Sequence, residues 1–248
     1  MTPYLCFLAS WVALTGSPVM AQVLVAGWDF QTTTTGGTAV ASSPNTPKIY
    51  SANFGSGSLY LDGSNGSSDW VVSSSGTELS GATGSTGNRT APGGINFANS
   101  TTSPAALHLA NTTANKKSAV FVFSMEGKSQ LTISLSTIRT NTGFDTQTWD
   151  YSANGGASWN NIGSVIPTTS YQTFSVAVAS ALDGIVDARV RVIFDGATGT
   201  TGNNRWDNIQ FVAIPEPSSS VLMMLGGAGL LGIRAMRRKN SLFEFKLK

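Results

Sequence analysis

Residues 131–135 read Leu-Thr-Ile-Ser-Leu, and this alternation of apolar and polar side chains decides the fold class. Successive side chains of a β-strand point to opposite faces, so the three apolar residues share one face. The same alternation recurs at residues 174–178 and 190–194. Between residues 22 and 213, no window of ten or more residues has helical spacing with caps. The sequence therefore predicts an all-β body of antiparallel strands.

Further short strands are expected along the same body, separated by turns rich in Gly, Asn, Ser and Thr. They cover residues 24–30, 59–61, 106–109, 119–124, 148–152, 173–178, 189–194 and 209–213. Two long polar segments, 31–47 and 63–94, are predicted to be loops that are either mobile or face a ligand. No repeat of fixed period is present, so we expect residues 22–213 to form one antiparallel β-sandwich of jelly-roll type.

Three phrases in the body resemble those of secreted bacterial sandwich domains. Residues 28–30 read Trp-Asp-Phe, residues 151–156 read Tyr-Ser-Ala-Asn-Gly-Gly with Trp159 after them, and residues 205–211 read Arg-Trp-Asp-Asn-Ile-Gln-Phe. They resemble galactose-binding-like or discoidin-like jelly-roll domains. The Asn-Gly-Gly turn also has its own physical reason, because these residues accept positive φ and join strands tightly. Such a turn leaves Tyr151 and Trp159 free to pair across a hairpin.

The chain begins with an apolar segment, residues 4–14, followed by residues that break helices. Small or tolerated residues at Val19 and Ala21 predict a cut between Ala21 and Gln22. Residues 1–21 are therefore predicted to be a secretory signal peptide, with a buried N-terminal strand or helix as the alternative. The single cysteine, Cys6, lies inside this segment, so the exported protein would have no disulfide and no thiolate chemistry.

The C-terminal region combines a turn motif, an apolar run and a basic cluster. Residues 214–218 read Ile-Pro-Glu-Pro-Ser, the apolar run spans residues 221–233, and the basic cluster is Arg234, Arg237, Arg238 and Lys239. A helix over residues 218–236, with a rise of about 1.5 Å per residue, nearly crosses a hydrocarbon core of roughly 30 Å. The basic cluster places the C-terminal end of this helix in the cytoplasm. We therefore predict a transmembrane helix with the body outside the membrane and residues 240–248 as a cytoplasmic tail.

Residues 214–239 resemble the PEP-CTERM sorting domain of Gram-negative bacteria. This resemblance implies recognition and cleavage near Pro215, Glu216 and Pro217 by a membrane enzyme of the exosortase type. It also implies an organism that makes exopolysaccharide or biofilm matrix, and it assigns Arg237 and Arg238 to the cytoplasmic flank. A simple membrane anchor without processing is the alternative reading of the same segment.

Composition excludes several function classes. Charged residues make up only 11% of the 248 residues, and the net charge is +2. Much of the positive charge lies in the last fifteen residues, so no basic patch in the body indicates a nucleic-acid partner. One histidine, His108, and one cysteine cannot form an ordinary zinc site.

Candidate ligand-binding residues are few. Carbohydrate binding would use aromatic side chains, and four are available: Trp70, Trp149, Trp159 and Trp206. Trp70, in a polar segment, is the exposed candidate, whereas Trp149 and Trp206 are expected to pack in the core or a hairpin. Asp29 and Asp207 are weak candidates for a structural calcium ion, since they would meet if the first and last strands pair. The alternative is that Asp207 caps the turn into the last strand. No other cofactor is expected.

The sequence thus favours an exported surface or extracellular-matrix protein of a non-enzymatic, structural or interaction type. Its expected location is the membrane through the C-terminal helix, and then the cell surface or matrix. The alternative is a carbohydrate-binding module acting on exopolysaccharide. A hydrolase is a third class, but the sequence gives no reason to pair any two of its acidic residues across a cleft.

Overall fold

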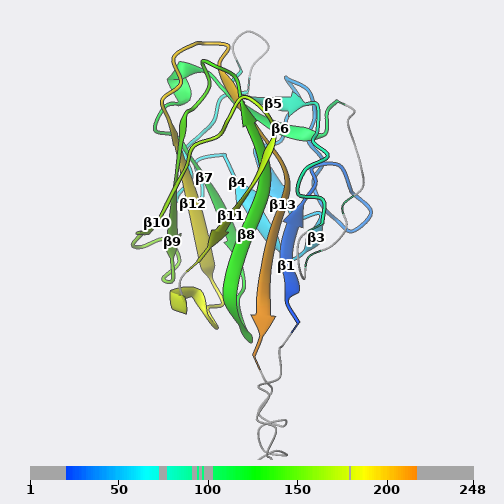
Figure 1. Cartoon of the computed structure of the whole chain (residues 1–248), viewed down its shortest axis with the longest axis vertical. Coiled ribbons are helices and arrows are strands. Elements are labelled where there is room, and N and C mark those ends of the chain that lie inside the picture. Colours follow the sequence, from blue (N-terminus) through cyan, green and yellow to red (C-terminus); the bar gives the residue numbers. More distant parts are fainter. Residues whose placement is uncertain are drawn as a thin grey trace, which may run out of the picture.

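Two antiparallel sheets pack face to face in the computed structural model (Figure 1). The structure describes residues 21–72, 77–90, 94, 97, 103–178 and 180–216. Helical structure in this part of the chain is limited to two 3-10 turns, η1 (Thr112–Ala114) and η2 (Ser180–Leu182). The predicted all-β antiparallel sandwich is therefore confirmed. The predicted signal peptide, up to residue 20, and the predicted transmembrane helix lie outside the described residues.

Strand β13 (Asn203–Pro215) runs through the middle of the first sheet. The order of this sheet is β11 (Gln172–Ala177), β8 (Lys128–Arg139), β13, β1 (Val23–Trp28) and β3 (Phe54–Gly55). On the side away from β8, β13 pairs first with β6 (Ala106–Ala110) and then with β1. Strand β5 (Leu79–Ala82) extends the sheet beyond β6. Strands from the start, middle and end of the body are thus all joined through β13.

The second sheet has the order β10, β9, β12, β7, β4, β2. Its strands are β10 (Asn160–Val165), β9 (Thr146–Ser152), β12 (Ala188–Asp195), β7 (Ser118–Phe123), β4 (Gly57–Tyr60) and β2 (Ile49–Ser51). In β12 buried and half-buried residues alternate at every position. This is the burial expected of a strand with one face on the core and one toward solvent.

Aromatic side chains fill the space between the sheets. The ring of Phe121 lies 5.0 Å from the rings of both Trp28 and Phe211, and 6.0 Å from the ring of Trp206. Trp149 is 6.0 Å from Trp206, and all these rings are fully buried. The prediction that Trp149 and Trp206 pack in the core is confirmed.

The predicted strands are all present, with ends that shift by a few residues. Four short strands were not predicted: β2, β3, β5 and β10. Strand β5 lies inside the segment 63–94, which was expected to be a loop. That segment is tied down by the buried Glu78, whose carboxylate accepts hydrogen bonds from the Val71 N–H at 2.8 Å and from Lys117 Nζ at 2.5 Å. The contact with Lys117, 39 residues away in sequence, holds this segment and is not visible in local pattern.

Strands β9 and β10 form the predicted hairpin, but the loop between them runs over residues 153–159 and is not a tight turn. Gly155 and Gly156 have φ of 64° and 84°, in the region that glycine adopts without strain. The expected pairing of Tyr151 with Trp159 is wrong, because Tyr151 pairs with Asn160. Trp159 precedes the strand, and its ring lies 4.4 Å from the Arg191 guanidinium carbon.

Replacing Phe121 with Ala should lower the free energy of unfolding by about 3–5 kcal/mol, because the cavity lies between buried rings that cannot collapse into it. Val122→Ala is the matched control, since the neighbouring side chain faces outward and is half-buried. We expect it to cost less than about 1.5 kcal/mol. Urea unfolding of both variants is the measurement, and equal losses would contradict the described core.

Candidate functional site

The Pro-Glu-Pro motif starts inside the last strand. Ile214 pairs with Ser129 and Pro215 pairs with Lys128, both at the beginning of β8. The Glu216 N–H then donates a hydrogen bond of 2.9 Å to the Gly127 carbonyl, although the residue itself is exposed. The first two motif residues are therefore attached to the sandwich. Pro217 and the basic residues Arg234, Arg237, Arg238 and Lys239 lie outside the described part.

Both predicted processing sites lie at the same end of the sandwich. Val23, the first residue of β1, pairs with Ala213 near the end of β13. Ala21 and Gln22, the predicted signal cleavage site, immediately precede β1. The two ends of the folded body are therefore adjacent, as Figure 1 shows at its lower end. Within the described residues, no helix is long and apolar enough to cross a membrane.

Trp70 is buried, so the prediction that it is exposed to carbohydrate is wrong. Its Nε1–H donates to the Ser118 carbonyl at 2.9 Å, and its ring meets Phe144 and Phe194 edge-on. The polar neighbours in sequence suggested exposure, but the ring turns inward against Phe194 of β12 and against Phe144 in the loop between β8 and β9. Among the tryptophans that the structure describes, Trp159 is the one that is partly exposed.

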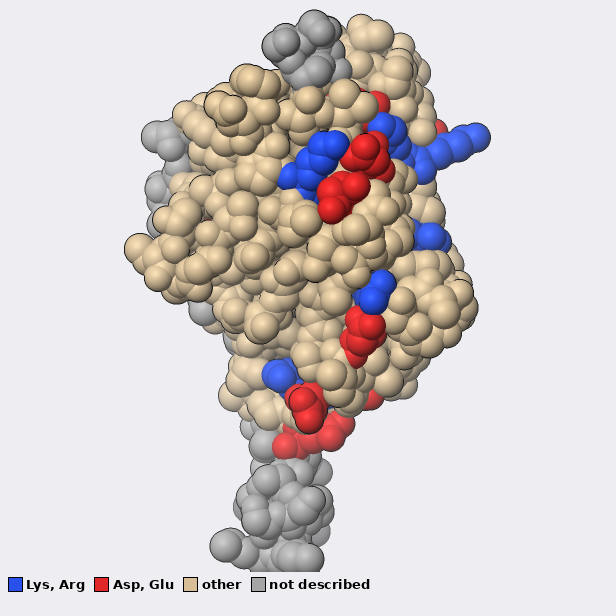
Figure 2. Space-filling model, turned by 180° about the vertical axis from the view of Figure 1, so that it is seen from behind, with Lys and Arg blue, Asp and Glu red and all other residues tan. Residues whose placement is uncertain are grey.

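The outer face of the second sheet carries charges in pairs (Figure 2). Arg191 binds Asp150 at 2.6 Å beneath the ring of Trp159. Arg189 binds Asp187 at 2.9 Å and also donates to the Asn65 carbonyl at 3.3 Å. Because each of these arginines has an acidic partner, this face presents no field of one sign of the kind that attracts nucleic acid.

Strands β1 and β13 pair, and they bring Asp29 and Asp207 within electrostatic reach of each other. The Asp207 carboxylate accepts hydrogen bonds from the N–H groups of Ser85 and Asn208, at 2.5 and 2.8 Å. The Asp29 carboxylate accepts from the N–H groups of Gln31 and Thr32, and from the Thr32 hydroxyl.

Calcium takes six to eight oxygen ligands. In the described residues no group of three or more His, Cys, Asp or Glu side chains converges. A calcium ion at Asp29 and Asp207 stays a prediction. The two carboxylates that would bind it already accept hydrogen bonds from neighbouring N–H groups. Asp207 does not cap a turn before the last strand, because it lies within β13.

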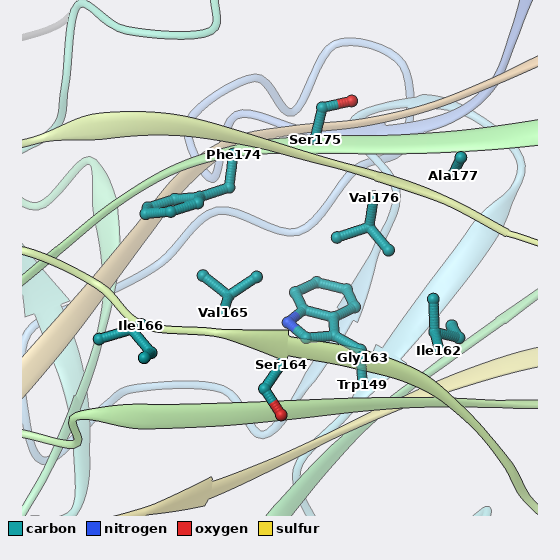
Figure 3. A pocket seen from close by; sticks show the side chains of 10 residues that line it. All are labelled: Trp149, Ile162, Gly163, Ser164, Val165, Ile166, Phe174, Ser175, Val176 and Ala177. Atoms are coloured by element: carbon teal, nitrogen blue, oxygen red, sulfur yellow. The ribbon is translucent and has the colours of Figure 1, made fainter.

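A groove opens between the edge strands of the two sheets, β10 and β11 (Figure 3). It encloses about 540 Å³ and is lined mainly by apolar side chains. They are Trp149, Ile162, Val165, Ile166, Phe174 and Val176. The indole of Trp149 lies among these side chains, and its buried Nε1–H has no hydrogen-bond acceptor.

Comparison with protein families matches residues 213–239 to the PEP-CTERM protein-sorting motif. This chain carries a PEP-CTERM sorting motif. The match begins at Ala213, within β13, one residue before the predicted segment. No enzyme family is shown for the body, and comparison with curated proteins gives no match.

Several solved β-sandwich structures are similar to the body. A carbohydrate-binding module of family 4 is 15% identical, with 45% of this chain and 73% of that chain covered and a TM-score of 0.34. The K3 adhesin domain of Lys-gingipain from Porphyromonas gingivalis W83 is 14% identical, with 77% and 98% covered and a TM-score of 0.40. The CBM22-1 xylan-binding domain of Xyn10C from Paenibacillus barcinonensis is 8% identical, with 48% and 78% covered and a TM-score of 0.35. Values this low carry no argument about what the present chain binds.

The groove between β10 and β11 was not predicted from the sequence. Its residues come from two sheets, and the pairing of those sheets is not visible in local pattern. One signal was available, namely that no charged residue occurs between residues 151 and 182. Trp159 was available in the sequence as an aromatic contact, but Trp70 was preferred because its neighbours are polar.

The buried Asp207 and the half-buried His108 give the sandwich a pH dependence. Burial, opposed by its hydrogen bonds and assisted by Asp29, raises the pKa of Asp207 to about 8. Burial and the nearby Arg205 lower the pKa of His108 to about 4. Asp207 therefore stabilises the fold at low pH and loses this contribution as pH rises toward 8, whereas His108 loses its contribution as pH falls below about 6.5.

Between about pH 6.5 and 8 the ionisation of Asp207 changes stability with pH, whereas His108 no longer does. We therefore expect the free energy of unfolding to fall as pH rises through this range. Asp207→Asn should remove this fall, while His108→Gln should leave it in place. Urea unfolding at several pH values is the measurement. A wild-type stability that rises over this window would contradict the assignment.

Proposed function

We propose that this chain is an exported bacterial surface or extracellular-matrix protein of a structural or interaction type. Residues 1–21 direct export, the sandwich faces outward, and the PEP-CTERM segment holds the protein in the membrane until an exosortase-type enzyme processes it. The observation that carries the proposal is that the matched motif begins inside β13, the central strand of the body. Sorting signal and folded body are thus continuous, without a linker between them.

This continuity has a consequence for processing. Pro215 is paired with Lys128, and the Glu216 N–H is bound to the Gly127 carbonyl. An enzyme that cuts near these residues must either open the last pairings of β13 or accept the motif against the turn that joins β7 and β8. The membrane-proximal end of the sandwich is then part of what the enzyme meets.

Intact-mass analysis of protein released by a host with an exosortase-type enzyme tests the proposal. The released chain should begin at Gln22 and end near residues 215–217. Glu216→Ala should strongly reduce release, because it changes the motif, whereas Glu126→Ala changes an exposed glutamate at the same end but outside the motif. A released protein that always retains Lys248 would contradict the proposed processing.

Carbohydrate binding is the second candidate function, and the partly exposed Trp159 supports it. Its ring lies over Arg191, with the Asp150 carboxylate and the Asn161 amide joined by a hydrogen bond of 3.1 Å nearby. An aromatic face beside charged and amide groups is the combination that stacks on a sugar ring and bonds its hydroxyls.

A glycan array and a pull-down with exopolysaccharide test this second function. Trp159→Ala should abolish binding, whereas Tyr171→Ala should retain it, because this half-buried aromatic side chain precedes β11 of the other sheet and its hydroxyl donates to the Thr83 carbonyl. Circular dichroism would show that both variants are folded. Absence of binding by the wild-type protein to any polysaccharide would remove the second candidate.

A further inference from the structure

Strands β10 and β11 form one open edge of the sandwich. Each pairs with a neighbour on one side only, β10 with β9 and β11 with β8 (Figure 1). The other side of each strand keeps main-chain N–H and C=O groups that are not used within the sheet. Such edges are templates for pairing with another strand, and natural proteins usually protect them with charges, prolines or bulges.

These two edges differ in how they are protected. Strand β10 carries a bulge between Asn161 and Gly163, which interrupts its regular pairing. Strand β11 pairs with β8 through six consecutive residues without any shift of register. Neither strand has a charged side chain, and none occurs anywhere from residue 151 to residue 182. Strand β11 is therefore a regular and uncharged edge.

The side chains of β11 divide between solvent and the groove. Thr173, Ser175 and Ala177 are exposed on the outer face, while Phe174 and Val176 line the groove between the sheets. Across the groove, the Ile166 side chain is 66% exposed. Beneath them lies the Trp149 Nε1–H without an acceptor. The edge thus combines unused main-chain groups, exposed apolar surface and a buried donor that lacks a partner.

We propose that β11 pairs antiparallel with β11 of a second copy of this chain, so that the first sheet continues across a two-fold axis. An extended polypeptide supplies main-chain donors and acceptors at the spacing of a strand, which a polysaccharide does not.

The absence of charge at this edge is suited to a second copy of the chain as the occupant. In a symmetric interface the same surface meets itself, so any charge near the axis would face its own copy. Residues 151–182 contain no charge that would be repelled or desolvated in this way. The apolar residues of the two copies, including Ile166 and Val176, would cover each other. This self-association goes beyond the proposed sorting and does not depend on processing.

Cysteine cross-linking tests the contact directly. Cys6 is the only cysteine, so Cys6→Ser gives a cysteine-free full chain. In that background Ser175→Cys should form disulfide-linked dimers under mild oxidation in detergent, because cross-strand neighbours near the axis lie about 5 Å apart. Ser56→Cys, exposed at the turn between β3 and β4 on the opposite edge, is the matched control and should stay monomeric on a non-reducing gel.

Charge variants test whether the same contact drives association. Light scattering over a dilution series from about 0.1 mM to about 1 μM should give twice the monomer mass for the wild type at the upper end, where a dimer of micromolar affinity is almost fully formed. Ser175→Lys and Ser175→Glu should each weaken association at least about tenfold, which corresponds to about 1.4 kcal/mol. An equimolar mixture of the two should restore the dimer.

Two outcomes would overturn the proposal. One is a wild-type protein that remains monomeric, including one that instead holds a polysaccharide at this edge. The other is a dimer that persists unchanged in both charge variants, since this would place the contact elsewhere, for example in the apolar run of residues 221–233. Circular dichroism on each variant separates loss of association from loss of folding.

Discussion

The structure depends on the pairing of β13 along both of its sides. Its inward side chains Trp206 and Phe211 lie at the centre of the aromatic core, while its backbone joins β8, β6 and β1. Strand β1, near the start of the chain, pairs along its length with β13, which lies almost two hundred residues later in the sequence. Strands this far apart in sequence pair late in folding, because the entropy cost of closing the long loop comes before the stabilisation by the contacts. We therefore expect the sandwich to complete its fold only after the chain has been exported up to the sorting motif.

Buried polar groups fix the segment that crosses the outer face of this sheet. Asn208, at a bulge of β13 with φ of 50°, donates through Nδ2 to the carbonyls of Ser85 and Gly87. The Gln210 amide donates to the Asn88 carbonyl at 3.1 Å. Together with the Asp207 carboxylate on the Ser85 N–H, these bonds hold residues 85–88 against β13. A polar segment that reads as a loop is thereby made part of the domain, and an acidic group with a raised pKa is buried beneath it.

The sequence predicted what depends on local pattern. Leu131, Ile133 and Leu135 alternate with polar residues because one face of β8 covers the core, so the strand and the fold class were visible. The sorting motif was recognised for the same reason, since it is read along the chain rather than across the fold. Strand β10 was missed because its bulge and its Asn and Gly residues disrupt alternation.

Trp70 shows the limit of local reading. Its neighbours in sequence are polar, but its indole bonds the Ser118 carbonyl, 48 residues away, and packs against Phe144 and Phe194. The meeting of Asp29 with Asp207 was anticipated only because pairing of the first and last strands was assumed. The groove at β10 and β11 requires knowing which strands are left at the edges, and that follows from the whole strand order.

Amide hydrogen exchange of the full chain in detergent tests most directly that the sorting motif begins within the folded body. The decisive amide is that of Glu216, which donates to the Gly127 carbonyl. It should exchange more slowly than in an unstructured peptide, together with the amides of β13 that precede it. Exchange of Glu216 at the unprotected rate, while residues 206–211 remain protected, would contradict the continuity of motif and strand.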